Sequence, residues 1–167
     1  MRTTLALGSA VMLAGCCLGG GGGGGSSSAP VSHRLDPYGI SISLSAAHTG
    51  GATPTGYTFT SGDGSSTVQV TAAAPGVPAA QRSPTELLPG TVAEVQWSRP
   101  ATFGGLPGVE SRVLERSPAA RAHWIGAVDG PRGVVWVHLF TDAHWVPGPT
   151  DGDLGWTTLR DSVRPAP

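Results

Sequence analysis

Alternating apolar and small polar residues predict three short strands after residue 30. From Tyr38 to Leu44 the chain alternates Tyr, Ile, Ile and Leu with Gly and Ser, and this period of two is typical of a strand with one buried face. Alternating segments at 57–60 and 67–71 flank a run of Ser, Gly and Asp at 61–66, which predicts a hairpin. The segment 46–56 is rich in Gly and Thr, so we expect an exposed loop there.

A helix is predicted in the middle of the chain. The segment Ser83–Glu86 has the spacing of a capping box, with Pro84 at the first helical position. Pro89 would interrupt a helix, because proline removes a hydrogen bond and clashes with the preceding turn. We therefore expect a short first turn, then a helix over 91–97 whose apolar side chains share one face, ended by Arg99-Pro100.

The second half of the chain is predicted to be a meander that ends in a helix. Strands are expected over 109–116 and 119–128, followed by a turn at 129–133. The run 134–140 is the most apolar of the domain, which indicates a central strand covered on both faces. Over 154–163, Trp156, Leu159 and Val163 recur at helical spacing after two possible N-caps, Asp151 and Asp153, so a closing helix is expected.

The N-terminus has the features of an export signal. An apolar segment from Leu5 to Leu13 follows Arg2; it is shorter than the roughly 20 residues needed to span a bilayer, and its length suits a signal-peptide core. It ends in Leu13-Ala14-Gly15-Cys16, which resembles the lipobox of bacterial lipoproteins. We expect residues 1–15 to be a signal peptide and Cys16 to carry a lipid that anchors the protein to the outer face of the bacterial cell membrane. A plain secretory signal, an uncleaved anchor and cleavage before Cys17 are the alternatives.

Composition separates a linker from one domain. Residues 16–30 contain the glycine run Gly19–Gly25 and three serines, cannot bury apolar area, and are predicted to be a disordered linker. The remaining 31–167 have the length of a single domain. The formal net charge is −1, and no basic patch is visible, which argues against nucleic-acid binding. Cys16 and Cys17 are the only cysteines, so no internal disulfide framework is expected.

The order of these elements supports a family resemblance. A lipobox and linker precede the Tyr38-Gly-Ile strand, a Leu106-Pro-Gly-Val109 strand start follows the hairpin and capped turn, and a Trp156–Val163 helix closes the chain. Over about residues 31–165, this order resembles the actinobacterial lipoproteins of the Lpp/LpqN type, which are similar to the PsbP-like fold. The resemblance implies an α+β fold with an antiparallel sheet packed between helices. It also implies an envelope role in binding lipids or proteins, and it brings no catalytic motif.

Few residues suggest chemistry. His138, Asp142 and His144 could supply metal ligands, but no fourth ligand is indicated, and ordinary polar residues at a strand end are the favoured interpretation. Asp151-Gly-Asp153 lacks the other oxygen ligands of a calcium loop, which favours helix capping. No Gly-x-Ser-x-Gly segment marks a nucleophile. The other histidines, His33, His48 and His123, are expected at the surface or the core edge, and neither a metal nor a cofactor is expected.

Tryptophan is the best hint of a binding function. The chain has five Trp, and most are expected to fill the core. Trp145, which lies in the Pro- and Gly-rich segment 144–149, could instead line a binding surface. We therefore expect a non-catalytic, membrane-anchored module that binds envelope proteins. The alternatives are a carrier or sensor of an apolar envelope molecule, favoured by a deep apolar pocket, and a hydrolase, favoured by a Ser-His or His-carboxylate pair in a cleft.

Overall fold

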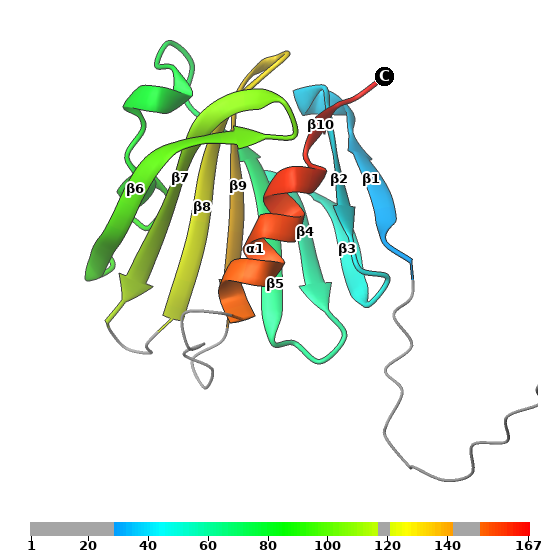
Figure 1. Cartoon of the computed structure of the whole chain (residues 1–167), viewed down its shortest axis with the longest axis horizontal. Coiled ribbons are helices and arrows are strands. Elements are labelled where there is room, and N and C mark those ends of the chain that lie inside the picture. Colours follow the sequence, from blue (N-terminus) through cyan, green and yellow to red (C-terminus); the bar gives the residue numbers. More distant parts are fainter. Residues whose placement is uncertain (1–28, 117–120, 142–150) are drawn as a thin grey trace, which may run out of the picture.

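In the described part of the chain, two antiparallel sheets and one α-helix form the fold (Figure 1). The computed structural model describes residues 29–116, 121–141 and 151–167, without the side chains of 151–154. The large sheet has seven strands in the order β3-β4-β5-β9-β8-β7-β6, and the small sheet has the order β1-β2-β10. The strands of the large sheet are β3 (His48–Thr53), β4 (Gly56–Ser61), β5 (Ser66–Ala72), β6 (Ala93–Phe103), β7 (Leu106–Glu115), β8 (Arg121–Gly130) and β9 (Gly133–Thr141). The other elements are β1 (Val31–Leu35), β2 (Ile40–Leu44), β10 (Arg164–Pro165), the 3₁₀ turns η1 (Asp36–Tyr38), η2 (Ala79–Gln81) and η3 (Pro84–Leu87), and α1 (Asp151–Ser162).

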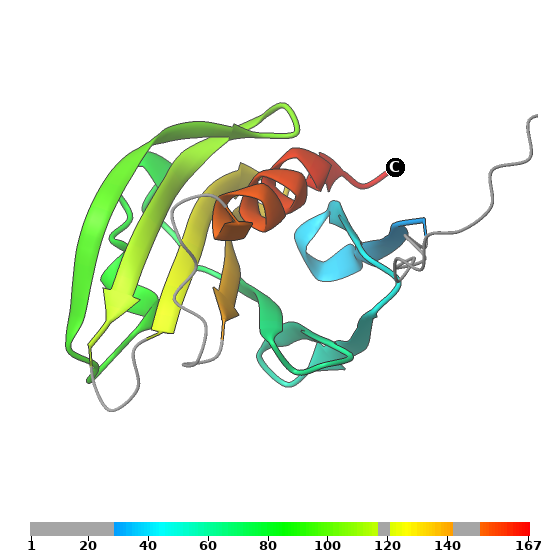
Figure 2. The ribbon, with the colours of Figure 1, turned by 60° about the horizontal axis from the view of Figure 1, so that its bottom comes forward.

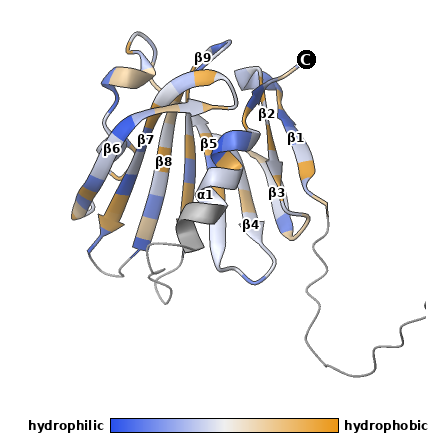
Figure 3. Cartoon of the chain, viewed as in Figure 1, coloured by the Kyte–Doolittle hydropathy of each residue, from blue (hydrophilic) through white to orange (hydrophobic). Residues whose placement is uncertain are grey.

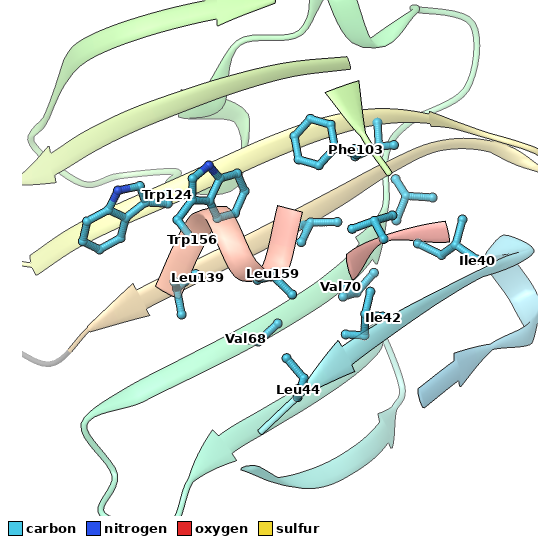
Figure 4. Close-up of a cluster of buried hydrophobic side chains, with 14 of the residues drawn as sticks. Ile40, Ile42, Leu44, Val68, Val70, Phe103, Trp124, Leu139, Trp156 and Leu159 are labelled. Atoms are coloured by element: carbon cyan, nitrogen blue, oxygen red, sulfur yellow. The ribbon is translucent and has the colours of Figure 1, made fainter. Parts of the chain in front are cut away.

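The main core lies on the inner face of the large sheet. Figure 2 shows this sheet bent around α1, with β1 and β2 beside the helix. Apolar side chains from β2, β5, β8 and β9 meet those of α1 there (Figure 4). Trp156, Leu159 and Val163 are buried in this core, at 2%, 4% and 0% exposure. The closing helix and the orientation of its apolar face are therefore confirmed.

A smaller core lies on the outer face of the large sheet. It consists of Ala79, Val113, Ile125, Ala127 and Trp136, and Leu87 and Leu88 pack against it. The segment with η2 and η3 is fixed to this face by a hydrogen bond from the Ala79 N–H to the Asp129 carboxylate, 3.0 Å long. β9 is central, between β5 and β8, and its Val135, Val137 and Trp136 are buried on the two faces. The prediction of a central strand covered on both faces is confirmed.

The predicted helix over 91–97 is wrong, because this segment begins the long strand β6. The strand runs through Pro100, which is tolerated because β6 is at the edge of the sheet. The capping box at Ser83–Glu86 does form, but it opens only the 3₁₀ turn η3. A bulge between Val95 and Trp97 shifts the register, so these residues do not lie on one face as in a regular strand. The bulge breaks the period of two from which a strand could have been predicted.

The predicted loop at 46–56 is also wrong. Residues 48–53 form the edge strand β3, which pairs with β4 along its whole length. Gly50 is required by this pairing, since a Cβ there would lie 2.1 Å from the Thr58 carbonyl oxygen. The antiparallel sheet of the expected fold class is confirmed. In the described residues, however, the sheet is covered by one α-helix on the inner face and by 3₁₀ turns outside, and does not lie between helices.

The other predicted strands lie close to their predicted positions, whereas β1 and β10 were not predicted. β7 and β8 span most of the segments expected at 109–116 and 119–128, and Figure 3 shows apolar and polar residues interspersed along β7. The turn expected at 129–133 shrinks to Pro131 and Arg132, because β8 and β9 extend to Gly130 and Gly133. Within the part of the chain that the structure describes, no helix is long and apolar enough to cross a membrane.

Candidate functional site

Three buried polar side chains on the outer face of the large sheet are joined by hydrogen bonds. Nδ1 of His123 lies 2.9 Å from Nε2 of His138, and Nε2 of His123 lies 3.2 Å from a carboxylate oxygen of Glu115. All three residues are buried. They come from the adjacent strands β9, β8 and β7, which place His138, His123 and Glu115 in one hydrogen-bonded chain.

The donors and acceptors of these hydrogen bonds follow from the carboxylate of Glu115. A carboxylate accepts hydrogen bonds, so Nε2 of His123 carries the proton and donates it to Glu115. Nδ1 of His123 is then the acceptor for the N–H at Nε2 of His138. Burial, together with the charge of a protonated His123, lowers the pKa of His138 to about 3. Burial also lowers the pKa of His123, against the opposing effect of Glu115, so both imidazoles are neutral at pH 7.

Glu115 orients His123 as a carboxylate orients a catalytic base, but no nucleophile among the described residues forms a hydrogen bond with either histidine. Among the described residues, the hydrogen-bond partners of the two imidazoles are each other and Glu115. Phe140 packs against both rings, with centroid separations of 5.9 Å to His123 and 5.0 Å to His138. General base catalysis requires a nucleophile within hydrogen-bond reach. Because the described residues place none there, this geometry favours a structural role.

A second buried polar group connects α1 to the inner face of the sheet. The carboxylate of Glu110, in β7, accepts hydrogen bonds from Nε1 of Trp156 (2.8 Å) and Nε of Arg99 (2.7 Å). Arg160 of α1 completes the cluster at 3.3 Å. Burial alone would raise the pKa of Glu110, but the hydrogen bonds from Trp156 and Arg99 and the charge of Arg160 outweigh it and hold this pKa below its ordinary value. Glu110 is therefore an ionised anchor for the helix.

Next to Glu110, arginine and tryptophan alternate across three strands. Trp97 of β6 pairs with Arg112 of β7, and Arg112 pairs with Trp124 of β8. The guanidinium of Arg112 lies 5.5 Å from the ring centre of Trp124, and that of Arg99 lies 4.7 Å from the ring centre of Trp97. We call these four residues the arginine–tryptophan row. Trp124 is buried, whereas Trp97 and Arg112 are half-buried and the Arg99 side chain is 63% exposed.

Two aliphatic side chains are exposed at the start of β6, Val92 just before the strand and Val95 within it. Val92 is 66% exposed and Val95 is 40% exposed. Leu87 and Leu88 of the η3 segment, which contacts β6, are half-buried. We call these four residues the outer-edge patch. β6 is the last strand of the sheet, so one side of its backbone is free of strand partners in the described structure.

Most of the candidate site residues named from the sequence lie outside the part of the chain that the structure describes. Cys16, Trp145, Asp142 and His144 lie outside the described residues, as do the side chains of Asp151 and Asp153, which begin α1. His138 is engaged with His123. The described residues contain no group of three or more His, Cys, Asp or Glu side chains that could hold a metal ion.

The two remaining histidines carry no catalytic arrangement. His33, in β1, packs its ring on Phe59 with 4.5 Å between centroids. His48, in β3, lies 3.4 Å from the hydroxyls of Ser45 and Ser66, which is long for hydrogen bonds of this kind. Burial lowers the pKa of His48. Because no carboxylate of the described residues forms a hydrogen bond with His48, it lacks the orienting group of a catalytic triad.

Sequence reasoning missed Glu110, Arg99 and Arg112. The signal that could have found them is the alternation of β7, where Glu110 and Arg112 fall on the same face as Leu114. A charged residue at a core-facing position of a strand needs a partner, because an unpaired buried charge is costly. The pairing of Arg99 with Glu110 depends on the register of β6, which the bulge conceals.

An open groove lies at the C-terminal end of α1. It has a volume of about 660 Å³ and is lined by Thr102, Gly104, Gly105, Arg160, Asp161 and Arg164. This lining is polar, and the two arginines are accompanied by Asp161, which pairs with Arg160 at 2.9 Å. The groove is therefore unlike the deep apolar pocket that a carrier of an apolar molecule needs.

Comparisons with known proteins show the fold alone. The chain matches no protein-family model and no curated protein. It is similar to the solution structure of the cyanobacterial PsbP protein CyanoP from Synechocystis sp. PCC 6803, with a TM-score of 0.59 at 15% identity over 88% of this chain and 98% of that one. A protein of unknown function from Pseudomonas aeruginosa, described as a putative regulator, is similar with a TM-score of 0.47 at 12% identity over 83% of this chain and 98% of that one. The fold is therefore PsbP-like, as the sequence resemblance implied.

Proposed function

We propose that this protein is a non-catalytic binding module of the bacterial cell envelope, anchored to the membrane through a lipid on Cys16, that docks a protein partner on the outer-edge patch. The observation that carries the proposal is the exposure of Val92 and Val95 at the start of the edge strand β6, which contacts the η3 segment with its half-buried Leu87 and Leu88. Exposed aliphatic side chains gathered at one sheet edge are typical of protein–protein contact surfaces. The membrane anchor rests on the lipobox sequence.

Features of β6 indicate how a partner would dock. Pro100 and the bulge at residues 95–97 hinder another strand from pairing along the whole edge. Docking through side chains fits this edge better than the addition of a complete strand. The partner's contact segment is then expected to be apolar, to match the four aliphatic residues of the patch.

The two other functions have less support. The groove at the end of α1 is open and polar, which does not favour a carrier of an apolar molecule. The His123–Glu115 pair is a His-carboxylate pair within hydrogen-bond reach, but it is buried, and none of its hydrogen-bond partners in the described part of the chain is a nucleophile. A hydrolase would need both a cleft and a nucleophile at this position.

Site-specific photo-crosslinking in cells tests the proposal. A photoreactive amino acid at Gln96, which is exposed beside Val95 on β6, should give a discrete protein adduct. The same amino acid at Thr49, exposed on the opposite edge strand β3, is the matched control and should give none. Val95→Asp in the Gln96 background should abolish the adduct while the melting temperature stays within a few degrees. Equal adducts at both edges, or an adduct that survives Val95→Asp, would contradict the proposal.

A further inference from the structure

We propose that Arg112 is the centre of a binding site for an oxyanion, a carboxylate or phosphate group attached to an aromatic ligand. The site is the arginine–tryptophan row on the inner face of the sheet. It is separate from the outer-edge patch, because Val95 and Trp97 lie on either side of the bulge in β6. The inference therefore does not depend on the proposed protein-binding function.

The hydrogen-bonding state of Arg112 is the first observation. Its Nε is buried and has no hydrogen-bond partner. In the described part of the chain, no carboxylate or carbonyl oxygen accepts a hydrogen bond from its guanidinium. Other arginines are bound to such oxygens, namely Arg34, Arg82, Arg99, Arg116, Arg132, Arg160 and Arg164. A half-buried guanidinium without an acceptor is costly, and an oxyanion would supply the missing acceptors.

Nearby carboxylates do not satisfy this charge. One oxygen of Glu110 accepts from Arg99, and the other accepts from Trp156 and Arg160. Glu94, which is on β6, is paired with Arg116. The positive charge of Arg112 is thus not balanced by an ion pair within the described residues, and Arg99, with its exposed side chain, adds a second cation on the same face.

The neighbouring rings determine the kind of ligand. The guanidinium of Arg112 covers the ring of Trp124, which leaves the in-plane N–H groups of its two terminal nitrogens to bind an oxyanion through two parallel hydrogen bonds. Trp97, directly across from Arg112 and only half-buried, offers an indole surface to a flat group attached to that oxyanion. An aromatic carboxylate or an aromatic phosphate ester combines both features.

Ligand titration of the full chain in detergent micelles tests the site, with tryptophan fluorescence and indole N–H NMR signals as readouts. Phenyl phosphate and benzoate should bind saturably and shift the indole signals of Trp97 and Trp124. Inorganic phosphate and acetate lack the ring and should bind at least about tenfold more weakly. Benzyl alcohol lacks the charge and should not saturate.

Variants connect the binding to Arg112. Arg112→Gln should weaken phenyl phosphate binding by at least about tenfold, and Arg112→Lys, which keeps the charge but loses the planar fork, should weaken it by less. Arg34→Gln, which removes an exposed arginine of the small sheet, is the matched control and should leave binding unchanged. If Arg112→Gln does not fold, the Lys variant and the wild-type indole shifts decide. Absence of saturable binding, equal loss in Arg34→Gln, or indole shifts that leave out Trp97 and Trp124 would overturn the proposal.

Discussion

At the scale of single residues, the unusual feature of the interior is a pair of buried, neutral histidines, His123 and His138. A histidine side chain ordinarily titrates near pH 6.5, yet His123 of β8 and His138 of β9 are buried, and burial disfavours their charged forms. The carboxylate of Glu115 faces His123 on one side, and the charge of Arg121 opposes protonation of the same ring. The stability of the folded domain is therefore expected to depend on pH through this histidine pair.

We predict that this domain loses stability as the pH falls from about 6.5 towards 3. Burial lowers the pKa of His138 to about 3 and that of His123 below its ordinary value. The unfolded chain therefore binds more protons than the folded chain in this range, so acid favours unfolding. Each histidine can contribute up to about 1.4 kcal/mol per pH unit. Urea unfolding at pH 7.5, 6.0 and 5.0 measures the slope.

Removal of one imidazole is the control for this prediction. His138→Asn should reduce the pH dependence, although it lowers stability at pH 7.5. Phe140→Leu disturbs the packing against both rings but removes no titrating group, so it should lower stability and keep the slope. If the two variants show the same slope as the wild type, the histidine pair is not the source of the acid sensitivity.

At the scale of elements, α1 is held to the sheet by apolar packing and by one buried anchor. Trp156 contributes to both, since its ring meets Phe103 edge-on at 6.0 Å and its indole N–H donates to Glu110. Gly126 makes room for these two rings, because a Cβ there would lie 2.5 Å from Phe103. Loss of the Trp156 side chain would leave both a cavity and a carboxylate short of one donor.

We predict that Trp156→Ala destabilises the domain by roughly 3–5 kcal/mol, the range for large aromatic side chains removed from a core. Thr158→Ala, on the exposed side of the same helix, should change the free energy of unfolding by less than about 1 kcal/mol. Chemical denaturation of both variants at pH 7.5 gives the two values. Similar, small effects at both positions would show that α1 does not contribute to the stability of the sheet.

Elements with a regular local pattern could be predicted from the sequence, and elements shaped by distant partners could not. β2, β5 and α1 bury side chains at constant spacing, so their period is visible in the chain. β6 carries a bulge, and β3 contains Gly50, which its neighbour β4 requires, so neither strand shows a period of two. The site residues depend on distant pairing even more, since Trp156 and Glu110 are 46 positions apart. The sequence could not show that Arg112 lacks an acceptor, because its surroundings depend on the register of three strands.

At the scale of the whole molecule, the start of the described chain and the proposed docking edge lie on opposite sides. The described chain begins beside β1, and Figure 1 shows β1 and β6 on opposite sides of the molecule. A lipid on Cys16 would hold the protein by its β1 side, so the outer-edge patch on β6 would face away from the point of attachment. This arrangement suits a module that presents a binding surface to other proteins of the envelope.

The membrane anchor gives the last prediction. If Leu13-Ala14-Gly15-Cys16 is a lipobox, the wild-type protein should begin at a diacylglyceryl-modified Cys16 and partition into the detergent phase. Cys16→Ser removes the thiol that takes the lipid, so this variant should be misprocessed or released into the aqueous phase. Cys17→Ser, one position later, is the matched control and should behave as the wild type. Detergent partitioning and the intact mass of the mature chain measure both properties. A wild-type chain that starts at another residue, or that lacks the lipid mass, would exclude the lipid anchor and leave the binding surfaces on a protein that is not tethered in this way.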